Sequence, residues 1–417
     1  MARDPERRPS YISLLKNRAF SYLWVGQLVS QSGDAVFDVA LLWLVLATTG
    51  STALVGLTQA AVLVPIVLAS PVAGVYADRT NRRNLMIVSS VIQGIITAAF
   101  SVLYLTNSLN FSLLILLVLL LYTGAQFYRA ANSAIIPRIV TREDLGAANG
   151  LFALSQSANQ LVGYTAGGII ILALGVTVPI TYDSLTFFFA AAVLTLISKS
   201  YGQPRPPSPG STADRPRFWD DFREGLHYLR QSMVFLQLVF FGLLINFFGG
   251  ALVALLAPYA KLSLHGDAST YGFLLSSFAL GTITGSILIG KVNFRHYVGR
   301  LLFFGAAVFG ALFALIGLVT SVPAALTVFF AMGMTLACVN IPISTLVQTQ
   351  IPGELLGRAT TALGALLSAA QPIAAVLAGT LAGLTSIGSV FLGSGVAVVV
   401  LSFGLYPFFE KLRRASY

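Results

Sequence analysis

Twelve apolar segments, each long enough to cross a lipid bilayer, make up most of this chain and leave few folds open to it. A helix rises about 1.5 Å per residue, so about 20 apolar residues span the hydrocarbon core. Hydrophobic residues are 56% of the 417 and charged residues only 10%, whereas soluble domains carry about a quarter. We therefore expect an all-α membrane protein. The expected spans are residues 20–47, 52–76, 85–106, 110–135, 147–174, 178–200, 233–261, 269–290, 300–320, 323–347, 358–384 and 388–409.

Positive charge falls almost entirely on one side of these spans. If both termini share a side, all but two of the 25 Lys and Arg residues lie there, the exceptions being Arg129 and Lys261. Cytoplasmic loops of membrane proteins are enriched in Lys and Arg, so we expect both termini in the cytoplasm. The net charge of +10 then orients the protein in the membrane and does not indicate nucleic-acid binding.

One long polar stretch divides the spans six and six. Its first part, from Tyr201, is rich in Pro and Ser, and its second part, from Phe218, has apolar residues near helical spacing. We expect a linker followed by a short amphipathic helix on the inner membrane surface. The predicted division is an N-terminus (1–19), a six-helix bundle (20–200), a linker (201–232), a second six-helix bundle (233–409) and a tail (410–417).

A dense charged turn, GVYADRTNRR, connects the second and third spans. It contributes Gly74, Asp78, Arg79, Arg82 and Arg83. The turn is too short to be a domain and too charged to lie in lipid. A shift of about 215 residues aligns it with a basic turn at Gly290 and aligns Ile136-Pro137 with Ile351-Pro352, which indicates a duplicated six-helix unit.

This turn resembles the signature G-x-x-x-D-R-x-x-R-R of the major facilitator superfamily. The second copy, GKVNFRHYVGR, has Phe294 where the acid would stand. The stretches SAIIPRIVTREDLGAANG, ITYDSLTFF and VQTQIPGELLGRA look like the drug- and siderophore-exporting branch related to macrolide efflux proteins and the enterobactin exporter. The resemblance implies two pseudo-symmetric six-helix bundles with a substrate site between them near the midplane, used by alternating access.

The fifth span resembles a glycine motif of exporters, G-x8-G-x3-G-P-x2-G-G. Asn159 and Tyr164 replace one glycine and the proline. Small residues at such spacings let helices approach closely, so ordinary packing is the alternative interpretation. The matching residues are Gly150, Gly163, Gly167 and Gly168.

Polar residues inside the spans are the candidates for transport chemistry. The first span carries one helical stripe of Gln27, Gln31, Asp34 and Asp38. Asp34 is expected near the midplane, roughly 20 Å from the inner end of its helix. A carboxylate there costs about 3 kcal/mol unless it faces a cavity or a partner.

The fourth span shows a stripe with the same spacing, formed by Tyr122, Gln126, Arg129 and Ser133. We expect both stripes to face one aqueous pocket, in which Asp34, with Asp38 beside it, carries a coupled proton and the charge of Arg129 opposes protonation. In the alternative, Asp38 lies near the outer headgroups and Arg129 extends its charge toward the membrane surface.

In the second half, Asn246 and Asn340 are candidates for the cavity wall, although each could equally form a helix–helix hydrogen bond. The three histidines lie in or beside loops, and neither a Ser-His-Asp set nor a P-loop occurs. We therefore expect no enzyme activity, no metal and no cofactor.

The charged turn itself is expected to be a latch. Asp78 can meet a positive helix N-terminus across the interface, while the arginines of the turn pair locally. The resemblance implies that this partner is the eleventh span, expected to begin near Gly357 and Arg358. Such a contact would hold the cytoplasmic side closed. In the alternative, these charges only fix the topology.

The sequence thus predicts a secondary exporter of amphipathic small molecules in a prokaryotic plasma membrane, driven by protons. An importer, a facilitator or a lipid flippase without proton coupling is the alternative. The expected partners are the substrate, protons and membrane lipid, with no nucleic acid, and the expected state is a monomer.

Overall fold

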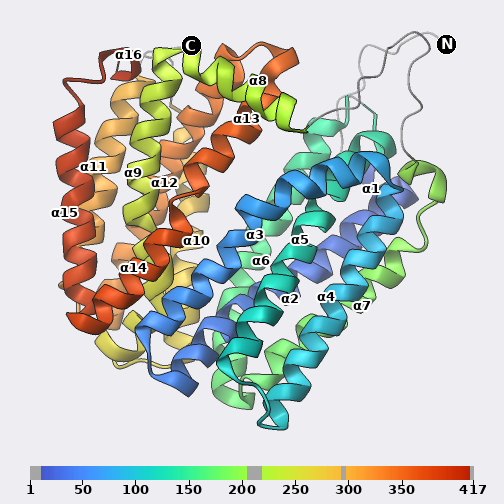
Figure 1. The fold of residues 1–417 in the computed structure, drawn as a ribbon, viewed down its shortest axis with the longest axis horizontal. Coiled ribbons are helices and arrows are strands. Elements are labelled where there is room, and N and C mark those ends of the chain that lie inside the picture. Colours follow the sequence, from blue (N-terminus) through green and yellow to red (C-terminus); the bar gives the residue numbers. More distant parts are fainter. Residues whose placement is uncertain (1–10, 142, 204–217, 293–296, 414–417) are drawn as a thin grey trace. The chain divides into compact units, whose positions relative to one another are not determined.

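The computed structural model describes residues 11–141, 143–203, 218–292 and 297–413. Twelve helices within these ranges are long and apolar enough to cross a membrane, and no strand occurs in them (Figure 1). The predicted fold class is confirmed, while the side on which the termini lie stays a prediction. The spans are α2 (Arg18–Thr49), α3 (Thr52–Arg79), α4 (Arg82–Leu105), α5 (Phe111–Ile139), α6 (Leu145–Leu174), α7 (Thr177–Leu194), α9 (Met233–Pro258) continued by η2 (Tyr259–Ser263), α10 (Ala268–Ile289), α11 (Val298–Ile316), α12 (Val322–Gln350), α13 (Gly353–Ser368) continued by α14 (Gln371–Leu384), and α15 (Ile387–Leu405).

Polar residues at the loop ends start several of these helices. Asn81 and Asn110 accept hydrogen bonds from the third residue beyond them, at 3.1 and 2.9 Å, at the starts of α4 and α5. Asp267 and Ser386 form reciprocal capping boxes at the starts of α10 and α15. Such caps satisfy backbone N–H groups that have no partner inside the helix, and so fix where each span begins.

The eleventh span begins at Gly353, earlier than the predicted start near Gly357 and Arg358. Pro352 immediately precedes it and separates it from α12, because proline favours the extended conformation that Ile351 adopts at the end of α12. The span is interrupted between Ser368 and Gln371, where a proline occupies the first turn of α14. A proline is tolerated there because the N–H it lacks has no helical partner anyway.

The helices group into two packing units. The first holds residues 1–37, 68–163 and 177–214, and the second holds residues 38–67, 164–176 and 215–417. The helices α2, α3 and α6 therefore each contribute to both units. The division into two bundles at 20–200 and 233–409 stays a prediction.

Each unit has its own apolar core. In the first, Phe20 and Leu23 of α2 pack with Ile135 and Ile139 of α5. In the second, Phe235, Phe241 and Phe303 form an aromatic centre, with Phe241 and Phe303 ring centroids 4.6 Å apart. The described residues also form four short helices: α1 (Tyr11–Lys16), η1 (Lys199–Gly202), α8 (Phe218–Gln231) and α16 (Glu410–Arg413).

The helix α8 lies where the sequence places a linker helix, while residues 204–217 of that linker lie outside the described ranges. Its Leu229 is buried in the core of the second unit, and its Tyr228 hydroxyl donates to the Gln350 carbonyl at 3.1 Å. Arg358 of α13 forms an ion pair with Glu224 at 2.5 Å. The apolar side of α8 thus packs on protein, and its place on the inner membrane surface stays a prediction.

Candidate transport site

The predicted polar stripe of the first span lies on α2. Asp34 is exposed, and Gln27 and Gln31 are partly buried. The Oε1 atoms of both glutamines are buried, and neither has a hydrogen-bond partner among the described residues. Buried polar atoms in native structures normally have a partner, so these two atoms need an explanation.

The start of α2 contacts the end of α5 within the first unit. The Asn17 side chain donates to the Ile139 carbonyl at 2.8 Å, which sets the register of two antiparallel helices. Counting away from this bond, Leu28 and Tyr128 are both eleven residues distant, so they lie at similar depth. Phe20 and Leu23 of α2 share one buried apolar cluster with Ile135 and Ile139 of α5.

Two polar residues of α5, Tyr128 and Asn132, were not among the candidates from the sequence analysis. Tyr128 precedes Ile135 by seven residues and Asn132 precedes Ile139 by seven, so both lie on the face that packs against α2. The Tyr128 hydroxyl and the Asn132 Oδ1 atom are buried without a partner among the described residues. The only signal in the sequence was this seven-residue spacing from apolar residues, which is also typical of ordinary core positions.

The Asp34 carboxylate is close enough to Tyr128 to act on it electrostatically. Side chains on a helix tilt toward its N-terminus, which directs the Tyr128 ring toward the depth of Gln31 and Asp34. We call this group the α2–α5 seam. It consists of Gln27, Gln31, Asp34, Tyr128 and Asn132.

The stripe predicted on the fourth span lies on a neighbouring side of α5. Gln126 is buried, accepts from the Ser70 hydroxyl at 3.0 Å and donates to the Tyr122 carbonyl at 3.1 Å. Arg129 is exposed, and among the described residues no ion pair joins it to a carboxylate. Arg129 is offset from Tyr128 by about 100° around the helix. The roles predicted for Tyr122, Gln126 and Arg129 stay predictions.

The other candidates lie in the second unit. Asp38 is partly buried and acts electrostatically on Tyr271 of α10. The Asn246 side chain accepts from Gln371 at 2.7 Å and donates to the Gly242 carbonyl at 2.8 Å, which is the helix–helix bond named as its alternative. Asn340 is exposed.

The glycines predicted on the fifth span lie on α6. A Cβ atom on Gly163 would lie 2.6 Å from the Ala35 Cβ of α2, and one on Gly168 would lie 2.5 Å from the Ala268 carbonyl oxygen. These two positions bring helices together more closely than a side chain allows. Gly167 is buried and Gly150 is exposed.

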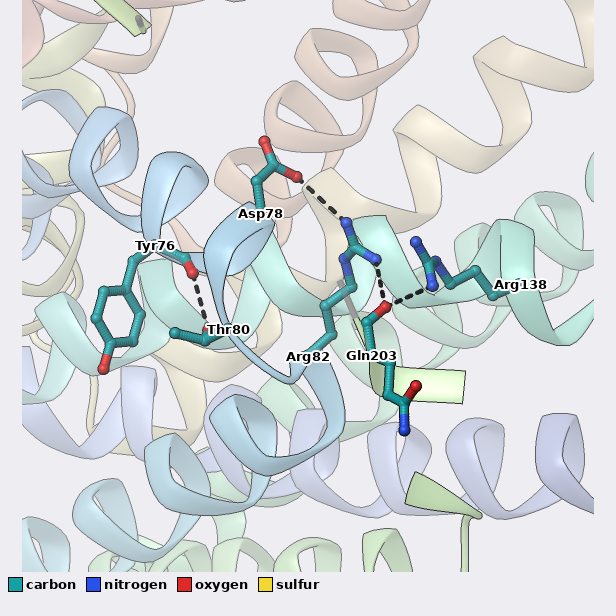
Figure 2. A network of polar contacts seen from close by, with 6 residues as sticks. All are labelled: Tyr76, Asp78, Thr80, Arg82, Arg138 and Gln203. Carbon is teal, nitrogen blue, oxygen red and sulfur yellow. Dashed lines mark hydrogen bonds and ion pairs between the residues drawn. The ribbon is translucent and has the colours of Figure 1, made fainter. Parts of the chain in front are cut away.

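The charged turn joins α3 to α4, and only Thr80 and Asn81 lie between the two helices. Arg82 pairs with Asp78 at 3.4 Å, the local pair that we predicted. The same guanidinium donates to the Gln203 carbonyl at 3.4 Å, and Arg138 donates to that oxygen at 2.5 Å (Figure 2). The turn thus holds the first residues of the linker.

Arg83 does not pair locally with an acid. Its side chain is buried and donates to the carbonyls of Leu194 at 3.1 Å and Thr195 at 2.5 Å, at the end of α7. The C-terminus of a helix carries partial negative charge, which a guanidinium neutralises. An arginine in the first turn of α4 opposes the dipole of its own helix, so its position depends on this contact with α7.

Comparison with known proteins identifies the family. Residues 10–414 match the family model described as transmembrane secretion effector, of the major facilitator superfamily. The chain belongs to this family. The predicted resemblance is confirmed: the protein is a multi-pass membrane transporter and not an enzyme.

Several of the relatives are named as bacterial efflux proteins. Macrolide efflux protein A of Streptococcus pyogenes is 24% identical over 404 residues, covering 95% of this chain and 96% of that one. Multidrug efflux pump Tap of Mycolicibacterium fortuitum is 23% identical, covering 90% and 91%. Among solved structures, a POT family transporter in complex with 5-aminolevulinic acid has a TM-score of 0.76 at 13% identity, covering 97% and 98%, which shows the fold.

Proposed function

We propose that this transporter exports amphipathic small molecules across the cell membrane in exchange for protons. It does so by alternating access, as a monomer, with Asp34 as the group that binds the proton. Support for export comes from the relatives, which are named as efflux proteins for macrolides and for multiple drugs. Macrolide-like compounds are therefore the first substrates to test.

The observation that carries the coupling proposal is the position of Asp34. It lies within a spanning helix, yet its side chain is exposed and acts on the buried Tyr128 hydroxyl. Acids are costly in spanning helices and, where present, commonly belong to proton or substrate pathways. The neighbouring polar atoms of the α2–α5 seam give a proton or a substrate group somewhere to bind.

The charged turn has a second role in this proposal. Asp78 lies in the last turn of α3 with its side chain 57% exposed, so it remains available for a contact beyond Arg82. A carboxylate at a helix C-terminus is electrostatically unfavourable, and the N-terminus of another helix would stabilise it. We propose that the N-terminus of α13 is that partner when the cytoplasmic side is closed.

The test is transport in proteoliposomes with an imposed pH gradient. Wild-type protein should accumulate erythromycin in the lumen against its gradient when protons flow out of the lumen. This exchange should make the lumen more alkaline. Asp34→Asn should lose gradient-driven accumulation by about tenfold or more, because the amide cannot carry the proton.

The matched control is Asp144→Asn, since Asp144 lies in the loop before α6 and accepts from the Thr141 hydroxyl at 3.0 Å. It should transport like the wild type. Full gradient-driven transport by Asp34→Asn would refute coupling through Asp34. Accumulation that ignores the pH gradient in the wild type would refute proton coupling altogether.

A further inference from the structure

The helix α8 carries a basic stripe on the side opposite its buried face. Arg223, His227 and Arg230 are all exposed and follow one another at intervals of four and three residues. This spacing places them within about 60° of one another around the helix. Gly225 and Leu229 lie about half a turn away from the stripe, and both are buried. The stripe is therefore the outer face of a helix whose inner face already packs on protein.

The one described acidic side chain of α8 does not neutralise this stripe. Glu224 pairs instead with Arg358 of α13 at 2.5 Å. Asp220 and Asp221 lie at the start of the helix, where the positive end of the helix dipole favours carboxylates. Within the described part of the chain, no carboxylate forms an ion pair with either arginine of the stripe. The stripe thus keeps positive charge for an anion.

The three basic side chains line a hollow in the surface of α8, together with Glu224 and the partly buried Leu226. The Gln231 amide nitrogen lies 2.8 Å from Nε2 of His227. An amide nitrogen only donates, so Nε2 accepts and the hydrogen of the neutral ring lies on Nδ1. Guanidinium and imidazole N–H groups are strong donors to phosphate oxygens, and Leu226 adds an apolar wall. The hollow therefore suits an occupant that has an anionic group beside an apolar part.

The hollow lies at the depth where spanning helices end. Ser232 alone separates α8 from α9, and the Tyr228 hydroxyl donates to the carbonyl of Gln350, the last residue of α12. Gly225 packs so closely on α13 that a Cβ atom there would clash with the Arg358 carbonyl oxygen. In Figure 1, α8 crosses this end of its unit. Spanning helices end at the lipid headgroups, so the stripe is within reach of them.

We propose that the hollow on α8 binds the headgroup of an anionic phospholipid. Arg223 and Arg230 bind the phosphate oxygens, His227 donates from Nδ1, and Leu226 contacts the first part of an acyl chain. Basic clusters beside spanning helices attract anionic lipids, and the apolar wall favours a lipid over a free phosphate. The site involves neither the transported molecule nor its coupling to protons, so it goes beyond the proposed function.

The test is lipid binding to the purified full-length protein in detergent micelles. Dioleoyl phosphatidylglycerol is the anionic probe, and dioleoyl phosphatidylcholine, which has the same acyl chains and no net charge, is its counterpart. Native mass spectrometry measures how much of each lipid the protein retains. The wild type should retain about tenfold more of the anionic lipid. Its melting temperature should also rise with this lipid, because α8 packs on α9 and α13, whereas sodium phosphate at the same concentration should not raise it.

Two double variants locate the site. Arg223→Gln/Arg230→Gln should reduce the preference for phosphatidylglycerol about tenfold, because two charges of the hollow are lost. The matched control is Lys291→Gln/Arg300→Gln, which removes two exposed charges between α10 and α11 of the same unit. This control should keep the preference of the wild type.

A third variant tests the apolar wall. Leu226→Ser should weaken retention of phosphatidylglycerol about threefold, because the acyl chain loses an apolar contact. Melting curves without lipid show whether each variant is folded. If the arginine variant fails to fold, unchanged retention by Leu226→Ser decides against the proposal.

Equal retention of the two lipids by the wild type would overturn the proposal. So would a preference that survives in folded Arg223→Gln/Arg230→Gln or that falls equally in the control, since the charge would then be recognised elsewhere. Equal stabilisation by sodium phosphate would mean that the hollow binds a free anion and no lipid. Because neither substrate nor gradient is present, failure here leaves the proposed function standing, and failure of proton-coupled export leaves the lipid site standing.

Discussion

The charged turn and the α2–α5 seam both bury polar side chains in the first packing unit, but they satisfy them differently. In the turn, Arg83 is 7% exposed and donates to Leu194, Thr195 and Asn84. One nitrogen, Nε of Arg82, is left without a partner among the described residues. In the seam, four side chains leave such an atom.

The difference separates a structural element from a binding element. Hydrogen bonds that are made within the protein stabilise it and leave nothing for a ligand. A buried polar atom without a partner costs about 1–3 kcal/mol, which the free protein must carry and which an occupant can recover. Arg83 of the turn therefore has a structural role, whereas the seam keeps hydrogen-bond capacity that the described residues do not use.

The largest effect is expected from Arg83→Ala. This change leaves the carbonyls of Leu194 and Thr195 without their donor and removes the charge that offsets the end of α7. We expect a loss of about 3 kcal/mol in the free energy of unfolding, measured as a clear fall in melting temperature. Arg79→Ala is the control, since Arg79 is exposed, and it should stay within about 0.5 kcal/mol. Equal melting temperatures for the two variants would contradict a structural turn.

Substitutions of two glycines near the turn, Gly202 and Gly74, should likewise differ in their effect on stability. A Cβ on Gly202 would lie 2.8 Å from the Arg83 backbone nitrogen and would clash with the Asn81 side chain, whereas a Cβ on Gly74 would meet nothing within 4 Å. Gly202→Ala should cost about 1–3 kcal/mol through overpacking. Gly74→Ala should leave the melting temperature unchanged. A Gly202→Ala variant with the wild-type melting temperature would show that the start of the linker is not closely packed against the turn.

These residues also show which features of the structure could be predicted from the sequence. The twelve spans followed from apolar length, because lipid imposes this length strictly. The family followed from the motif at Gly74. The contact of Arg83 with α7 joins residues more than a hundred positions apart, and no local pattern encodes it. Tyr128 was missed for a similar reason, since only the packing of α5 on α2 distinguishes it from the adjacent stripe through Gln126.

The seam itself can be compared with a satisfied glutamine nearby. Gln31→Leu removes a buried oxygen that has no partner, so it should raise the free energy of unfolding by about 1 kcal/mol. Gln126→Leu removes the bonds to Ser70 and Tyr122 and should lower it by a similar amount. Melting curves without ligand measure both. A destabilising Gln31→Leu would mean that the seam is already satisfied in the free protein.

The smallest change in stability is expected from Asp78→Asn. Its pair with Arg82 is 3.4 Å long and the carboxylate is 57% exposed, and such surface pairs contribute about 0.2–1 kcal/mol. Arg82 keeps its bond to the Gln203 carbonyl, so the turn should remain folded. The proposed latch, however, needs the carboxylate, and its loss should increase labelling of a cysteine placed at the cytoplasmic ends of the helices. Unchanged labelling would remove the latch and leave the turn with its structural role alone.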